Sequence, residues 1–151
     1  MPQITQRYVD TGEVLLVFWN HPLEAHHPFA LSAAAAATCA GRRGRFWQMH
    51  DALFRNQDRL DPPGLLSLAA TVGLDDPPFR ECLAGAGVAA VRSESSEAAR
   101  FGVREDPALL IGRLLSGGRI EVQEQIAGVR PLNVYTDVID RLVAQGKRNR
   151  R

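Results

Sequence analysis

Two apolar runs, one near each end of the chain, predict buried β-strands. Residues 13–19 read Glu-Val-Leu-Leu-Val-Phe-Trp, and a continuous β-prone run of this kind favours a strand buried on both faces of a sheet. The second run begins at Ala108, directly after Pro107, a residue that suits the first position of a strand because it cannot donate to a ladder. A Gly-Gly pair at 117–118 predicts a hairpin turn into a further strand at residues 119–127.

Between these runs the apolar positions recur every three or four residues, which predicts amphipathic helices. The predicted helices cover residues 29–40, 45–56, 61–73, 76–86, 88–101 and, after the last strand, 131–144. Asp61 and Asp76 each precede two prolines, which suits a helix N-cap followed by first-turn prolines. Residues 8–12 read as the end of an earlier helix that is followed by a glycine. Strands at both ends and helices between them indicate an α/β domain.

Composition and charge narrow the class of protein. A chain of 151 residues that is 45% hydrophobic has the size of a single domain with one core. A formal net charge of +1 gives no global case for nucleic acid, and no apolar stretch approaches the roughly 20 residues of a membrane span. The basic run at 147–151 is expected to be a solvated, frayed tail.

The beginning of the chain bears on its location. It lacks a charged segment followed by an apolar one, so it does not read as a secretory signal. As the chain stands, a cytoplasmic location is expected. If an upstream segment is missing, an extracytoplasmic one is expected instead.

The two cysteines, Cys39 and Cys82, are too far apart in sequence to form a Cys-x-x-Cys redox motif. Cys39 lies late in a predicted helix and Cys82 in the middle of another. Neither position offers the exposure and nearby positive charge that activate a thiolate, so no catalytic residue is predicted. The four histidines have no cysteine or carboxylate partners at zinc spacing, so no metal or cofactor is predicted either.

Two stretches resemble a known family. Gly102-Val103-Arg104, with Pro107 and a hydrophobic strand after it, resembles the cis-proline loop of the thioredoxin fold. Residues 17–54 contain, in order, a strand, Pro-Leu, His-Pro, an Ala-rich helix and Gly-x-Phe-Trp-x-Met-His-Asp-x-Leu-Phe. That order is similar to the start of the helical insertion in DsbA-type disulfide oxidoreductases. The resemblance covers nearly the whole chain, but the family's Cys-x-x-Cys is missing.

The resemblance implies an α/β, thioredoxin-like fold with an inserted all-helical subdomain, N-terminally truncated. Residues 1–151 would form one domain, with residues 13–25 and 102–145 as the thioredoxin-like part and residues 26–101 as the helical insertion. The peptide-presenting sheet that the resemblance implies requires residues 14–18 and 109–115 to share one sheet. It also places Cys39 and Cys82 in one subdomain, where they would form a structural disulfide or stay two buried thiols.

The same resemblance assigns a role to Asp106 and Pro107. In the family, the backbone of the residue before the cis-proline pairs with a bound peptide, a small case of strand addition. That residue here is Asp106, where the family more often has Thr or Val. A carboxylate at this place would raise the pKa of a neighbouring thiol and disfavour its thiolate.

Three functions are therefore considered. The first is a DsbA-like thioredoxin-domain protein that is redox-inactive as this chain, because the catalytic dithiol is absent. The second is a non-catalytic thioredoxin-like module for peptide binding or dimerisation, with cysteine-containing or extended polypeptides as partners and a homo-oligomeric state. A more distant alternative is a relative of the glutathione transferases or isomerases that share the plan of a thioredoxin domain with helices.

Overall fold

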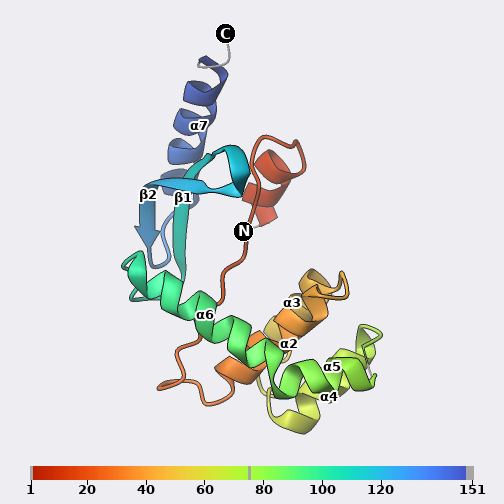
Figure 1. The fold of residues 1–151 in the computed structure, drawn as a ribbon. Coiled ribbons are helices and arrows are strands. Elements are labelled where there is room, and N and C mark those ends of the chain that lie inside the picture. The colour runs from red at the N-terminus through yellow and green to blue at the C-terminus, as the bar shows by residue number, and fades with distance from the viewer. Residues whose placement is uncertain (1, 75, 149–151) are drawn as a thin grey trace. The chain divides into compact units, whose positions relative to one another are not determined.

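In a computed structural model, which describes residues 2–74 and 76–148, the chain divides into two compact units. Residues 1–18 and 102–151 make up one, termed the sheet unit, and residues 19–101 make up the other, termed the helical unit (Figure 1). None of the helices in the described part of the chain combines the length and the apolar character that a membrane span requires.

In the described part of the helical unit, five helices lie close to their predicted positions. They are α2 (Ala30–Gly41), α3 (Phe46–Arg55), α4 (Pro62–Thr71), α5 (Pro77–Ala84) and α6 (Ala86–Arg100). The Ala-rich α2 contacts each of the other four. Ala35, Ala36 and Ala40 are completely buried, because their small side chains let neighbouring backbones approach on several sides of α2.

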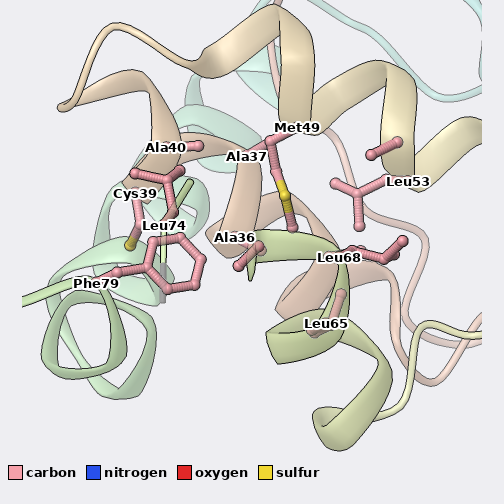
Figure 2. Packing of buried hydrophobic residues seen from close by; sticks show 13 residues of the cluster. Ala36, Ala37, Cys39, Ala40, Met49, Leu53, Leu65, Leu68, Leu74 and Phe79 are labelled. Carbon is pink, nitrogen blue, oxygen red and sulfur yellow. The ribbon is translucent and has the colours of Figure 1, made fainter. Parts of the chain in front are cut away.

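Larger side chains fill the space around α2. Met49 of α3, which is completely buried, extends between Ala36 of α2 and Leu68 of α4 (Figure 2). Phe79 of α5 packs into the same cluster beside Cys39. The alternation of small residues on α2 and large residues on its neighbours gives the helical unit an interdigitated core.

Two details of the predicted helices differ in the structure. The sequence predicted that Ala86 would be the last residue of the helix that starts at Asp76. In the structure Gly85, with φ −148° and ψ −79°, separates α5 from α6, and Ala86 is the first residue of α6. Asp76 caps α5 as predicted, since its Oδ1 accepts a hydrogen bond of 3.0 Å from the backbone N–H of Phe79. Asp61 precedes α4, but its side chain makes no capping hydrogen bond, so that part of the prediction is wrong.

Within its described residues, the sheet unit contains a hairpin, whose turn includes a short 3-10 helix, and helical segments before and after the hairpin. Its elements are α1 (Pro2–Ile4), which continues as the π-helix η1 (Thr5–Val9), β1 (Ala108–Leu114), η2 (Ser116–Gly118), β2 (Ile120–Ala127) and α7 (Leu132–Arg148). The two strands are antiparallel, with Ala108 opposite Ala127 and an irregularity after Ile111. Gly112 follows that irregularity, where the backbone carbonyl of Glu121 leaves no room for a Cβ atom.

A small cluster holds η1 against α7. Its members are Ile4, Tyr8 and Ile139, with Val14, Ile111, Tyr135 and Val143 packed around them. The Tyr8 hydroxyl donates a 2.8 Å hydrogen bond to Asp140 Oδ1, and the Arg7 guanidinium lies 2.8 Å from Asp140 Oδ2. Burial, reinforced by the Asp140 carboxylate, raises the pKa of Tyr8 to about 12. One carboxylate on α7 thus anchors two consecutive side chains of η1.

The prediction for residues 13–19 is wrong. Within the described residues the sheet contains only β1 and β2, so residues 14–18 and 109–115 do not share a sheet. Leu15 and Val17 are 67% and 52% exposed, although Val14 packs on the cluster under α7. An apolar run shows that a segment can be buried on both faces. To form a strand, the segment also needs a neighbouring backbone with which to pair, and residues 13–19 lack one in the described sheet.

Two further expectations are corrected in the sheet unit. The strand after Pro107 is half-buried and not buried, and its last residue, Leu114, is 60% exposed. The basic tail was expected to fray from residue 147, but Lys147 and Arg148 belong to α7, and Lys147 forms an ion pair with Glu13. Residues 149–151 of that tail lie outside the described residues.

Candidate functional site

Pro107 lies at the beginning of β1, where the sequence placed it. The Asp106–Pro107 peptide bond is cis, and Gly102, with φ +76°, turns the chain out of the preceding segment. The Pro107 carbonyl accepts a hydrogen bond of 2.8 Å from the backbone N–H of Gly128, directly after β2. The loop that ends at Pro107 is therefore tied to the far end of the hairpin.

Tyr135 of α7 fixes the other side of this junction. Its hydroxyl donates to the Gly128 carbonyl at 3.2 Å and accepts from the Arg130 backbone N–H at 2.8 Å. Neither Tyr135 nor Gly128 was predicted from the sequence to contribute to this junction. The available signal was the tyrosine itself, because a half-buried Tyr usually places its hydroxyl on a polar partner.

The residues before Pro107 present charge to solvent. Arg104, Glu105 and Asp106 are all exposed, whereas Val103 is buried and anchors the start of the loop. β1 has a strand on one edge only, β2, within the described sheet. The N–H and C=O groups of an open edge can pair with an extended polypeptide, so strand addition is the chemistry that this geometry offers.

The two cysteines lie in the helical unit and are bonded to each other. Cys39 of α2 and Cys82 of α5 form a disulfide with a Cα–Cα distance of 5.9 Å, and no cysteine is free. Cys39 is 2% exposed. The sequence left a disulfide and two thiols as alternatives, and the structure brings the two side chains together.

Among the residues that the structure describes, no three His, Cys, Asp or Glu side chains come together to hold a metal ion. His50 Nδ1 lies 3.1 Å from Asp51 on the same helix. Two shallow hollows of the helical unit, of about 460 and 400 Å³, are lined by neither cysteine.

The fold and the Pro107 junction define an α/β domain of the thioredoxin-like class. Its hairpin starts at a proline loop, packs on a C-terminal helix and follows a five-helix unit in sequence. The thioredoxin family model matches residues 1–124, and the chain belongs to the thioredoxin family. The predicted fold class, thioredoxin-like with a helical insertion, is confirmed.

Curated relatives match the chain over part of its length. The chain is 44% identical over 89 residues to the Na(+)/H(+) antiporter NhaA 3 of Salinispora tropica. The aligned region covers 57% of this chain and 14% of the antiporter. Na(+)/H(+) antiporter NhaA 1 of Salinispora arenicola is 41% identical over 83 residues, covering 55% of this chain and 13% of the antiporter. NhaA 1 of Mycolicibacterium gilvum is 43% identical over 65 residues, covering 42% of the chain and 10% of the antiporter.

The matched region is thus a small part of each of these antiporters, at most 14% of its length. No solved structure matches the chain.

Proposed function

We propose that this chain is a DsbA-like thioredoxin-domain polypeptide that does not catalyse thiol–disulfide exchange by itself. The observation that carries the proposal is the pairing of its only two cysteines with each other. Exchange requires an accessible thiolate to attack and a second thiol to resolve the mixed disulfide. Cys39 and Cys82 supply neither while they are bonded and Cys39 is buried.

The DsbA-like assignment rests on features beyond the thioredoxin family itself. The helical unit lies between η1 and the proline-led hairpin in the chain, the place of the insertion in that family. We propose the predicted division, with residues 13–25 and 102–145 as the thioredoxin-like part and residues 26–101 as the insertion, although the compact units divide between residues 18 and 19. The part of the prediction that needed residues 14–18 in the sheet is withdrawn.

The peptide-binding role is proposed for Asp106, Pro107 and the open edge of β1. An extended polypeptide, including a cysteine-containing one, would pair its backbone with the Asp106 carbonyl and with β1. The hydrogen bond from Gly128 to Pro107 and those of Tyr135 hold this junction in place. A preorganised edge of this kind lowers the ordering cost of binding.

Two measurements on the intact chain test this proposal. In an insulin-reduction assay and a dithiol-oxidation assay we expect rates no higher than those with free cysteine, and robust turnover would overturn the redox-inactive assignment. With isotope-labelled protein and an extended peptide, amide shifts should concentrate at residues 106–111. Shifts confined to the helical unit would contradict the proposed peptide site.

A second candidate function comes from the antiporter relatives. Identity of 41–44% over 83–89 residues supports a role as a module that works within, or beside, a transport protein. Deleting the matched segment from such an antiporter should impair its exchange of Na⁺ for H⁺, and this chain supplied separately should restore it. Unchanged transport after the deletion would contradict that role.

The proposal also includes self-association into a homo-oligomer. Leu15 and Val17 are among the most exposed large apolar residues of the sheet unit, and exposed apolar segments without a ladder invite pairing.

A further inference from the structure

We propose that residues 14–18 of two copies of this chain pair as antiparallel β-strands about a twofold axis at Leu16. This inference names the surface for the self-association included in the proposed function, and it rests on that part alone. It does not depend on peptide binding at Pro107.

The backbone of residues 15–17 is available for a ladder, whereas the Val14 N–H already donates to the Tyr8 carbonyl at 3.0 Å. In the part of the chain that the structure describes, the backbones of Leu15, Leu16 and Val17 have no hydrogen-bonded partner. The side chains alternate, with Val14 and Leu16 half-buried and Leu15 and Val17 exposed. That alternation fits a pleated strand, because successive side chains of a strand point to opposite faces.

The sequence of the segment is complementary to itself. Antiparallel pairing about Leu16 places Val14 opposite Phe18 and Leu15 opposite Val17, so an apolar residue faces an apolar residue at every position. Pairs of β-branched, aliphatic and aromatic side chains are the cross-strand contacts that stabilise sheets. A foreign strand would need a matching apolar run, which a second copy supplies.

Charge favours the antiparallel arrangement over the parallel one. Glu13 comes to lie opposite Trp19 in the antiparallel pair, so the two Glu13 carboxylates are at opposite ends of the ladder. A parallel in-register pair would place them side by side, which is destabilising. A net charge of +1 per chain gives little long-range repulsion between copies.

Sedimentation velocity on the intact chain at micromolar concentration tests the surface. We expect the wild-type chain to form a dimer and Val17→Asp to raise its dissociation constant about tenfold or more, because two carboxylates would become buried in an apolar ladder. Val129→Asp is the matched control, since Val129 is an 82% exposed valine of the same unit. It should leave the dimer unchanged. A monomeric wild type, or equal weakening by both substitutions, would overturn the inference.

Cross-linking tests the register independently of that substitution. Directly opposite residues of an antiparallel pair have Cα atoms about 4.5–5.5 Å apart, a separation that a disulfide spans. Leu16→Cys should therefore form a covalent dimer on mild oxidation, and Val129→Cys should not. A mixture of Leu15→Cys and Val17→Cys chains should cross-link faster than either alone. No preference among these variants would contradict the twofold axis at Leu16.

The test of the dimer surface can fail without the proposed peptide site failing, and the reverse also holds. Val17→Asp leaves Asp106, Pro107 and β1 unaltered. Amide shifts at residues 106–111 with an extended peptide, measured in that variant, report on the peptide site whether or not the dimer forms.

Discussion

At the residue scale, one buried amide ties a loop to the helices around it. Asn20 is 6% exposed, and its side-chain amide donates to Glu94 Oε2 at 2.7 Å and to Thr38 Oγ1 at 3.3 Å. Its backbone N–H donates to the same Glu94 oxygen at 3.0 Å. Asn20 and Glu94 are 74 residues apart, so no local pattern in the sequence could have predicted this contact.

Removing the acceptor of this network should destabilise the helical unit. Glu94→Ala leaves two buried donors of Asn20 without their charged acceptor, a loss of about 1–3 kcal/mol in the free energy of unfolding. Urea denaturation followed by circular dichroism measures it. Glu97→Ala, on an exposed position of the same helix, is the control and should change stability by less than about 0.5 kcal/mol. Equal losses of unfolding free energy in the two variants would show that the hydrogen bonds of Glu94 do not stabilise the helical unit.

The raised pKa of Tyr8 predicts that the folded chain loses stability at alkaline pH. Its folded-state pKa of about 12 lies above the ordinary value of 10.0, so the folded chain holds the phenol proton more tightly than the unfolded chain. The stabilisation is complete below pH 10 and is lost as pH rises toward 12. In Tyr135→Phe, Tyr8 is the only tyrosine of the chain. Its phenolate absorbance should then rise with a midpoint of about 12, and a midpoint at 10 in a chain that is still folded would contradict this account.

At the scale of elements, spacing predicted the helices well and the first strand badly. Helices can be predicted from local sequence, because a 3.6-residue period, a following glycine and a proline in the first turn all lie within one segment. Residues 13–19 carry the composition of a strand, but a ladder depends on a second segment that composition cannot identify. The hairpin was predictable because Gly117 and Gly118 have φ of +77° and +76°, a conformation that favours glycine.

The two Asp-Pro-Pro helix starts offer a matched comparison. Asp76 accepts from the Phe79 N–H and pairs with Arg43 at 2.8 Å, whereas Asp61 makes no capping bond. Asp76→Ala should therefore lower the thermal midpoint more than Asp61→Ala, measured by circular dichroism. Equal midpoints for the two variants would show that the cap of α5 contributes nothing.

The Asp76 cap also predicts that the stability of the chain depends on pH in the acidic range. The hydrogen bond from Arg43, followed by that from the Phe79 backbone, lowers the pKa of Asp76 below its ordinary 3.8. Its contribution to stability is therefore present above that ordinary value and lost as pH falls through the lowered pKa. The difference in thermal midpoint between wild type and Asp76→Ala should shrink over that acid range. A difference that stays constant there would contradict the assignment.

Gly87 of α6 marks the closest approach between α6 and the disulfide. A Cβ atom at this position would lie 2.5 Å from Cys39 Sγ and 3.1 Å from the Ala35 carbonyl. Gly87→Ala should cost about 1–3 kcal/mol of unfolding free energy through overpacking. Gly146→Ala in α7, where no atom lies within 4 Å, should instead stabilise by up to about 1 kcal/mol. Stabilisation by both substitutions would contradict the close packing.

At the scale of the whole molecule, the sequence contained more about the class of fold than about the site. The long ordered string of residues 17–54 and the loop before Pro107 pointed to a thioredoxin-like domain with a helical insertion, which the family match confirms. The Cys39–Cys82 pairing depends on a tertiary contact, and the sequence left it open. The contact between Tyr135 and Gly128 was missed although it spans only seven residues, because helical spacing does not show where a tyrosine hydroxyl finds its partner.

The central claim is that this thioredoxin-family chain has no thiol with which to carry out exchange. Counting thiols in the unreduced, denatured protein with a thiol reagent tests it most directly, because denaturation exposes every cysteine and leaves a disulfide intact. We expect no reactive thiol before reduction and two after it, from Cys39 and Cys82. Two reactive thiols before reduction would contradict it.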